Sequence, residues 1–280
     1  MKVAIIGYGF VGKALHGGIK DNVEVIKIDP LLGTDTYDLA DFNPNFIFIC
    51  VPTPMNQDGS QDLSIAKKIV DTLSKMKSEA NIILKSTVLP DNLDYLSKEI
   101  DFVYNPEFLR EKSADHDFIN GKIILFGGDK KLCMDASKFY TEHTHCKQKE
   151  HFITDQKSAS LVKYSINSFL ATKVIFFNQL KSLFEISDLA SNWEDFINII
   201  SKDNRIGDSH MQVPGHDGRR GFGGACFPKD IAALEDFASK HEYNFSIIKE
   251  VIKVNNQIRS VYNEPTRRES EQNITFHEEN

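Results

Sequence analysis

The 280-residue sequence lacks the features that mark several classes of protein. Its four cysteines show no Cys-x-x-Cys pair and no framework spacing, which is typical of free thiols in a reducing compartment. No run approaches the roughly 18 apolar residues of a membrane-spanning helix. A formal net charge of −7 argues against nucleic acid as a partner. The N-terminus has no apolar segment followed by a cleavage site, so we expect a cytoplasmic protein that contacts no membrane.

Short β-rich runs alternate with helical stretches in the first half. Gly, Pro, Asn or Asp bound each run, and the runs cover residues 3–6, 23–28, 46–51, 82–85 and 122–126. Helical patterns lie between them near residues 11–20, 62–77 and 91–99. Alternating β and α units predict an α/β fold with a parallel sheet that helices cover on both faces.

The pattern changes to helices alone from about residue 157. Residues 158–184 contain neither Gly nor Pro and predict one unusually long helix. Further helices are predicted near residues 193–201, 229–241 and 245–260. We therefore expect three regions, namely an α/β domain at 1–156, a helical domain at 157–262 and a flexible polar tail at 263–280.

A glycine-rich turn follows the first predicted strand. Gly7-Tyr8-Gly9-Phe10-Val11-Gly12 fits the pattern G-x-G-x-x-G, and the second predicted strand leads to Asp29. Glycines let the backbone approach a pyrophosphate, and the first amides of the next helix face the anion. A carboxylate at this point accepts hydrogen bonds from a ribose diol, which favours NAD over NADP. Glycines also mark plain turns, but this context predicts a Rossmann-type NAD site.

A cysteine lies in a second glycine-rich segment, Gly221-Phe222-Gly223-Gly224-Ala225-Cys226-Phe227-Pro228-Lys229-Asp230. The glycines leave room for a bulky ligand, and Pro228 suits the first turn of a helix. Cys226 would then precede a helix N-terminus with Lys229 close by, and both features favour the thiolate. We expect Cys226 to be a catalytic nucleophile. The remaining cysteines are expected to be buried and inert: Cys50, Cys133 and Cys146.

The histidines are expected to bind no metal. His143, His145 and Cys146, with His151 nearby, fit no structural zinc spacing well. One polar loop also seldom supplies a complete coordination shell.

Further motifs occur in the order of one known family. They are Cys50-Val51-Pro52-Thr53-Pro54, Lys85-Ser86-Thr87-Val88, Asn105-Pro106-Glu107-Phe108-Leu109-Arg110-Glu111, the K-x-x-x-N pair Lys163 and Asn167, and Asp203-Asn204-Arg205-Ile206-Gly207. With the cysteine segment, they make the sequence resemble the UDP-glucose/GDP-mannose dehydrogenase family over about residues 1–260. The resemblance implies an NAD-dependent oxidoreductase that acts on a nucleotide sugar, most similar to a UDP-glucose 6-dehydrogenase of polysaccharide biosynthesis.

The resemblance implies two successive oxidations at C6 of one sugar. Cys226 would form first a thiohemiacetal and then a thioester, which water hydrolyses to the uronic acid. Lys163 and Asn167 lie four residues apart on one predicted helix face and would stabilise an oxyanion. Proton transfer and the placement of water would fall to three side chains whose tasks the sequence does not divide: Asp230, Glu107 and Thr87.

The resemblance also implies binding residues. Cofactor contacts are implied for Gly7, Tyr8, Gly9, Phe10, Val11, Gly12, Asp29, Val51, Pro52, Thr53, Ser86, Thr87, Glu111 and Lys229. Substrate contacts are implied for Glu107, Phe108, Leu109, Arg110, Lys163, Asn167, Arg205, Phe222 and Gly223. Arg205 would reach the sugar site of a neighbouring subunit, in a homodimer formed through the long helix.

The sequence departs from the family pattern near its end. Family members continue into another α/β domain that holds the nucleotide, whereas about twenty residues follow position 260 here, so we expect this third domain to be missing. Arg268-Glu269-Ser270 resembles a short motif of that domain, in which the arginine approaches the cofactor. Gly121-Lys122 also stands where the family usually has an arginine before the strand.

Alternative interpretations stay open. GDP-mannose or UDP-N-acetylmannosamine are rival substrates, because their dehydrogenases share these motifs. A truncated, non-catalytic NAD-binding partner of a full-length enzyme is a second hypothesis. A two-electron hydroxyacid dehydrogenase of related architecture is a third, and it would not need Cys226. One thiol that alkylates much faster than the other three would indicate a working site.

Overall fold

The apolar runs of the first half form strands that bury side chains on both faces. The computed structural model describes residues 1–277 and divides into two units. Unit 1 comprises Met1–Thr53 and Gln61–Lys163, and unit 2 comprises Pro54–Ser60 and Tyr164–Asn280. The division falls seven residues after the predicted boundary at 156/157, inside one continuous helix.

Unit 1 contains one seven-stranded sheet of order β2-β1-β3-β4-β5-β6-β7. Its strands are β1 Lys2–Ile6, β2 Glu24–Ile28, β3 Phe46–Ile49, β4 Asn81–Leu84, β5 Val103–Tyr104, β6 Leu125–Gly127 and β7 Phe152–Thr154. Every neighbouring pair is parallel except β5 and β6, where Tyr104 pairs with Gly127 in antiparallel register. The predicted α/β class is confirmed, but the single antiparallel pair was not predicted.

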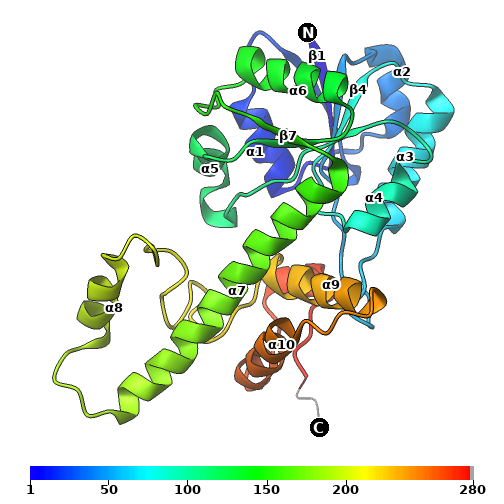
Figure 1. Cartoon of the computed structure of the whole chain (residues 1–280). Helices are drawn as coiled ribbons and strands as arrows, with labels where there is room; N and C mark the ends of the chain where they lie inside the picture. Colours follow the sequence, from blue (N-terminus) through cyan, green and yellow to red (C-terminus); the bar gives the residue numbers. More distant parts are fainter. Residues whose placement is uncertain (278–280) are drawn as a thin grey trace. The chain divides into compact units, whose positions relative to one another are not determined.

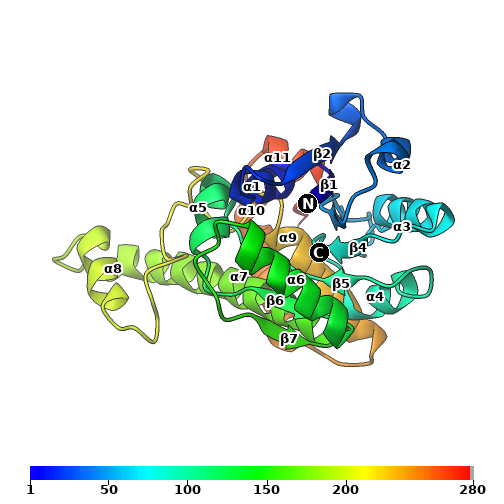
Figure 2. The ribbon, with the colours of Figure 1, turned by 90° about the horizontal axis from the view of Figure 1, so that it is seen from above.

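Helices cover both faces of this sheet (Figures 1 and 2). One face carries α1 Phe10–Gly18, α5 Ala114–Asn120 and α6 Lys130–His143. The other carries α2 Leu39–Phe42, α3 Ser64–Met76 and α4 Pro90–Leu96. Alternate residues of a strand serve the two layers, because Val3 and Ile5 belong to the first apolar cluster while Ala4 and Ile6 belong to the second. Burial on both faces is the reason that the strands read as continuous apolar runs.

Several elements of unit 1 were not predicted. Strands β5 and β7 have only two and three residues, too few for a periodic pattern. Helix α6 is longer, and its buried residues recur at helical spacing: Cys133, Ala136, Phe139 and Tyr140. That signal was present in the sequence and was overlooked.

Unit 2 is helical, as predicted. Its helices are most of α7 Gln156–Ile186, then α8 Trp193–Ser201, α9 Phe227–Lys240, α10 Ser246–Arg259 and α11 Arg267–Glu271. One apolar cluster joins α7, α9 and α10, and a second joins the end of α7 to α8. Helix α7 has 31 residues. Within residues 1–277, no helix is both long enough and apolar enough to cross a membrane.

The segment that we expected to be a flexible tail is folded over residues 266–274. The Thr266 hydroxyl accepts a hydrogen bond from the Glu269 amide, and the Glu269 carboxylate accepts one from the Thr266 amide. This reciprocal capping box starts α11. Glu269 and Ile274 are buried. The T-x-x-E signature was therefore readable in the sequence, and the expectation from polar composition differs from the structure here.

Candidate active site

The predicted site residues fall in both units, and each unit holds its own group of them. In unit 1, the glycine-rich turn joins β1 to α1. Gly7 has a φ of +90°, and a Cβ on it would lie 2.7 Å from the Cys50 carbonyl oxygen. A Cβ on Gly12 would collide with the Gly7 carbonyl oxygen. A Cβ on Gly9 would meet nothing within 4 Å, so space stays open above the backbone there. Two glycines are thus required by the fold, and Gly9 leaves room for a ligand.

Helix α1 begins at this turn without a side-chain cap. Gly9 is its N-cap residue, and Phe10 and Val11 form its first turn. The first amides of such a helix are orphan donors that attract an anion, and the helix dipole adds to the attraction. The turn also lies where the strand order reverses, between β1 and β3, which is where dinucleotides bind in sheets of this kind.

Asp29 follows β2 and holds the turn in place. Its Oδ2 atom accepts a hydrogen bond from the Tyr8 amide at 2.7 Å, and its Oδ1 atom accepts one from the Leu31 amide at 2.9 Å. Each carboxylate oxygen has a second lone pair, so this side chain retains acceptor capacity for a ribose diol. Asp29 therefore holds the turn in place and is also compatible with the predicted contact to a ribose diol.

The loops after β3 and β4 are tied to each other. The Thr53 hydroxyl donates to the Thr87 carbonyl at 2.8 Å, and the Ser86 hydroxyl donates to the Val51 carbonyl at 2.7 Å. All four residues are buried, while Pro52 is exposed. These predicted cofactor residues thus form one rigid stretch at the carboxyl ends of adjacent parallel strands.

Glu107 and Lys163 form a buried ion pair within unit 1. The Lys163 Nζ atom lies 3.2 Å from the Glu107 Oε1 atom, and the side chains are 3% and 7% exposed. The Glu107 Oε2 atom accepts a hydrogen bond from the Leu109 amide at 2.6 Å, and the Phe108 ring lies 5.5 Å from the Lys163 ammonium. The structure therefore brings together four of the predicted substrate residues.

Lys85 supports the start of this loop, a role that we did not predict. Its ammonium donates to the Asn105 side-chain oxygen at 2.8 Å and to the Tyr140 hydroxyl at 3.2 Å. The Asn105 amide group donates in turn to the Leu125 carbonyl. Burial lowers the pKa of Lys85. Tyr140 belongs to α6, the helix that was overlooked, and lies 55 positions from Lys85, so no local sequence pattern indicates this contact.

Arg110 and Glu111 lie at the exposed end of the same loop. The Arg110 guanidinium contacts both carboxylate oxygens of Asp117, at 2.9 Å and 2.7 Å. Hydrogen bonds from Arg110 hold the pKa of Asp117 well below its usual range. We predicted that Arg110 contacts the substrate and that Glu111 contacts the cofactor, and both statements stay predictions.

In unit 2, Cys226 is the N-cap residue of α9, and Pro228 occupies the first turn. The cysteine is partly exposed. We expected Cys226 to lie just before a helix N-terminus, where the helix dipole favours a thiolate. Lys229 lies in the same turn, but its ammonium is bound to Asp230 at 2.5 Å.

Asp230 is enclosed by two donors. Besides Lys229 on its Oδ1 atom, the Asn167 side-chain amide donates to its Oδ2 atom at 2.6 Å. Asp230 is 1% exposed, and Asn167 is 7% exposed. Asn167 comes from α7, one turn after Lys163 on the same helix face. The structure thus connects Asn167, Lys229 and Asp230 by hydrogen bonds, whereas we had predicted a separate role for each of them.

We expect Asp230→Ala to lower the free energy of unfolding by about 3 kcal/mol, because it leaves the buried Asn167 amide and the partly buried Lys229 ammonium without their carboxylate. Asp236→Ala is the matched control on the same helix. Asp236 pairs with Lys240, whose side chain is 63% exposed, so its removal should cost less than about 1 kcal/mol. Urea unfolding measures both, and equal losses would contradict this account.

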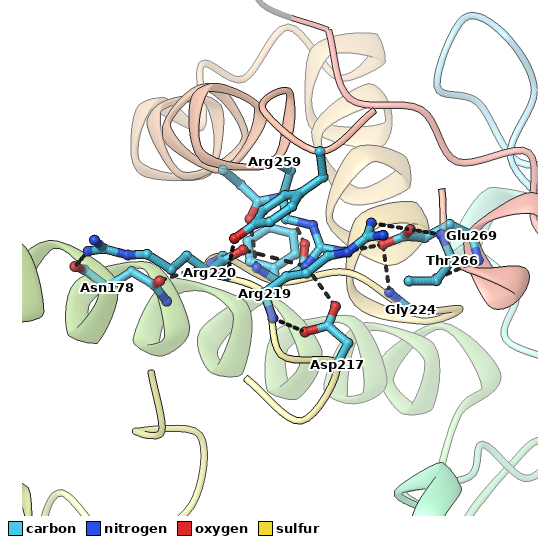
Figure 3. A network of polar contacts seen from close by, with 12 residues as sticks. Asn178, Asp217, Arg219, Arg220, Gly224, Arg259, Thr266 and Glu269 are labelled. Carbon is cyan, nitrogen blue, oxygen red and sulfur yellow. Dashed lines mark hydrogen bonds and ion pairs between the residues drawn. The ribbon is translucent and has the colours of Figure 1, made fainter. Parts of the chain in front are cut away.

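The loop before Cys226 is held by side chains that the sequence analysis missed. Asn255 accepts from the Phe222 amide at 2.7 Å and donates to the Phe222 carbonyl at 3.1 Å. Arg259 and Glu269 lie against Gly223, where a Cβ would collide with both of them (Figure 3). Asn255 and Arg259 continue the buried stripe of α10 after Ile248 and Val251. Two polar residues on an apolar stripe are the signal that could have identified them.

Arg205 lies in the segment that follows α8 and is exposed. Its side chain is 89% exposed and pairs with Asp203 at 2.6 Å in the loop after α8. The other three cysteines belong to unit 1, where Cys133 and Cys146 are buried as expected, whereas Cys50 is partly exposed. Burial raises the pKa of Cys50 to about 12 and that of Cys133 to about 11, and it also raises the pKa of Cys146.

The histidine segment offers no metal shell. The Cys146 thiol donates to the Phe118 carbonyl, and the His151 ring bonds to the Ser137 hydroxyl. Across residues 1–277, no three His, Cys, Asp or Glu side chains converge as metal ligands.

Comparison with known proteins identifies relatives of both regions. Residues 29–144 match the NAD binding domain of the UDP-glucose/GDP-mannose dehydrogenase family, and residues 157–257 match its central domain. UDP-glucose 6-dehydrogenase of Rickettsia felis is 35% identical over 242 residues, which cover 84% of this chain and 52% of that protein. The chain thus spans about half the length of the curated relatives that it matches.

Solved structures agree with this result. A UDP-glucose dehydrogenase from Pyrobaculum islandicum is similar with a TM-score of 0.75 and 25% identity, covering 91% of this chain and 68% of that one. The 3-hydroxyisobutyrate dehydrogenase of Mycobacterium tuberculosis has a TM-score of 0.67 at 14% identity, covering 92% of this chain and 94% of that one, which is a likeness of fold alone. Because the two matched domains together cover most of the sequence, the chain belongs to the UDP-glucose/GDP-mannose dehydrogenase family.

Proposed function

We propose that this chain oxidises a nucleotide sugar at C6 to the uronic acid with NAD as the hydride acceptor, and that UDP-glucose is the substrate. The observation that carries the proposal is the start of α9. There a partly exposed Cys226 occupies the N-cap position, and one turn later Asp230 is fixed by Asn167 and Lys229. A structural cysteine needs none of these neighbours, whereas a nucleophile needs an oriented polar environment.

The residues of unit 1 fit NAD. Gly9 leaves open space beside the uncapped start of α1, and the Asp29 carboxylate has acceptor capacity left for the ribose diol. Tyr8, Phe10 and Val11 contribute the backbone of that turn. NAD, when bound, takes up one hydride in each of two oxidations. The chain's own part is to hold the cofactor and to exclude NADP through the negative charge of Asp29.

The residues of unit 2 supply covalent chemistry. After the first oxidation converts the alcohol to an aldehyde, the Cys226 sulfur bonds to the aldehyde carbon and the carbonyl oxygen becomes an alkoxide. Loss of a second hydride from that carbon leaves a thioester. Water then attacks the thioester carbon, the carbon–sulfur bond breaks, and the uronate and the thiol are released. Asp230 and Asn167 are proposed to place the water and a donor for the oxyanion.

The residues around the ion pair are proposed to bind the sugar. Lys163 contributes positive charge that favours the alkoxide, and Glu107 holds the ammonium in position. Thr87, whose carbonyl is already bound by Thr53 and Gln61, retains its hydroxyl for a proton transfer.

The test is the yield of NADH from UDP-glucose, GDP-mannose and UDP-N-acetylmannosamine. Two NADH per sugar with one substrate would support the proposal and name the substrate. One NADH per substrate molecule would favour a two-electron hydroxyacid dehydrogenase. No turnover with measurable NAD binding would favour a non-catalytic NAD-binding partner of a longer enzyme.

We also propose a homodimer through α7. Within unit 2, three exposed apolar side chains recur every seven residues on this helix: Phe169 at 68%, Phe176 at 59% and Leu183 at 56% exposure. A seven-residue repeat places them on one stripe, and such stripes bury themselves against a second helix. The exposed Arg205 is then available to reach the partner subunit's substrate.

Replacing both Phe169 and Phe176 by serine should convert a dimer to a monomer at micromolar concentration, because it removes the two largest apolar contacts of the stripe. Sedimentation velocity measures the change. Tyr37→Ser is the control, since Tyr37 is 77% exposed on unit 1 and lies on no such stripe. A wild-type chain that is already monomeric would contradict the dimer.

A further inference from the structure

A fully buried ion pair lies behind the loop that leads to Cys226 (Figure 3). Arg259 from α10 and Glu269 from α11 are in contact at 2.5 Å, and both side chains are 0% exposed. The Arg259 guanidinium also donates to Asp217 at 2.7 Å. The rings of Tyr262 and Phe276 lie 5.5 Å and 5.3 Å from it. The charge is therefore enclosed by carboxylates and aromatic rings.

The pair touches the backbone of the loop directly. The Glu269 Oε1 atom accepts a hydrogen bond from the Gly224 amide at 3.3 Å, while its Oε2 atom accepts from the Thr266 amide at 2.6 Å. Arg259 donates to the Arg220 carbonyl at 3.4 Å. Gly223 lies between these contacts, and a Cβ there would occupy the place of the carboxylate. Two residues separate Gly223 from Cys226.

Stability alone is a poor explanation for this arrangement. The desolvation penalty of two buried charges is about as large as their mutual attraction. A protein with a well-packed apolar pair of the same volume in their place is therefore often as stable. An apolar pair, however, offers no acceptor for the Gly224 amide, and an unpaired buried amide is costly. What the carboxylate adds is a defined position for the loop backbone.

We infer that Glu269, held in place by Arg259, is a positioning residue that fixes the Gly223–Gly224 backbone and thereby the placement of Cys226. The inference rests on the proposed nucleophilic role of Cys226. It predicts an effect on the cysteine-dependent second oxidation and none on the NAD-binding residues of unit 1.

Two variants perturb the contact from opposite sides. Glu269→Gln keeps the shape but places an NH₂ group against the Arg259 or Thr266 donors. Gly223→Ala inserts a methyl group where the carboxylate lies. Glu271→Gln is the control, because Glu271 belongs to the same helix but pairs with Arg267 and Arg268 at the surface.

Hydrogen–deuterium exchange of the free full-length chain is the first measurement, since it requires neither substrate nor cofactor. The exchange rate of the peptide spanning residues 221–226 should rise at least about tenfold in Glu269→Gln and in Gly223→Ala. The rate in the double variant should be close to that of either single variant, because both changes disrupt the same contact. Exchange should stay at the wild-type level in Glu271→Gln.

Turnover of the aldehyde is the second measurement. In both variants kcat for aldehyde oxidation should fall at least about tenfold, while KM for NAD stays within about twofold. If no sugar or aldehyde is turned over by the wild type, the proposed function fails, and the exchange result alone still decides the inference. Wild-type exchange in the loop, or a loss of protection spread over all helices of unit 2, would overturn it, because the pair would then hold no particular backbone position.

Discussion

Iodoacetamide should label Cys226 at least about 20 times faster than any other cysteine of the folded chain at pH 7.5. With pKa values of about 12 and 11, Cys50 and Cys133 carry less than about 0.1% thiolate at this pH, against roughly 9% for an ordinary thiol. A thiolate of high pKa is the better nucleophile, but this recovers only about half of the difference on a logarithmic scale. Cys133 and Cys146 are also 0% and 3% exposed, which excludes the reagent further.

Mass spectrometry of tryptic peptides after timed labelling measures the four rates. Because burial raises the pKa of Cys50 to about 12 and that of Cys133 to about 11, labelling of these two thiols should increase steeply only as the pH rises toward 11. Uniformly slow labelling of all four would argue against a working nucleophile. Preferential labelling of Cys133 would contradict the burial that the structure shows.

Cys226→Ser should stop the reaction at the aldehyde stage and lower the rate of uronate formation at least about 10³-fold, since a neutral serine hydroxyl is a much weaker nucleophile than a thiolate. Cys133→Ser is the matched control on a thiol that has no proposed role. If uronate formation survives in Cys226→Ser, the thioester route is wrong, whatever the substrate.

The second large effect is expected at the glycine-rich turn, where two neighbouring glycines should behave differently. Gly7→Ala should lower the free energy of unfolding by about 3 kcal/mol, because Ala disfavours a φ of +90° and its methyl group would press on the Cys50 carbonyl. Gly9→Ala meets no atom within 4 Å and should cost less than about 1 kcal/mol. Gly9→Ala should nevertheless weaken NAD binding at least about tenfold, because the pyrophosphate is proposed to occupy that space.

Thermal unfolding and calorimetric titration with NAD separate the two roles. For a chain of this size, about 3 kcal/mol corresponds to a fall in Tm of roughly 6–12 °C. Unchanged NAD affinity in Gly9→Ala would show that the open space beside α1 is not a cofactor site. A Gly7→Ala protein as stable as the wild type would contradict the close approach of the two backbones.

The sequence predicted those elements whose signal is local. The long helix, α8, α9 and α10 were predicted to within a few residues, because uninterrupted helical periodicity and the Pro228 start signal lie in contiguous residues. The antiparallel pairing of β5 with β6 was not predicted. It joins two-residue and three-residue strands whose direction depends on the path of the intervening chain.

The candidate site residues also divide into those with a local signal in the sequence and those without one. Gly7, Gly12 and Cys226 were identified because a turn that needs a positive φ or a close backbone approach, and a helix start, each impose a residue type within one short motif. Other residues contact their partners across long stretches of sequence. Lys85 reaches Tyr140 across 55 positions, and Glu269 reaches Gly224 across 45. Contacts between positions so far apart leave no periodic pattern in the sequence, so only the structure could identify them.

By itself, the sequence determined the α/β class, the glycine-rich turn after β1 and the position of Cys226 at the start of α9, because backbone conformation and helix starts are properties of neighbouring residues. Only the tertiary structure decided which polar side chains are buried together. A charge can leave water only when a partner from another segment meets it. Lys163 with Glu107 and Asp230 with Asn167 are such partners, and 56 and 63 positions of sequence separate them, so distant parts of the chain must fold before either pair can form.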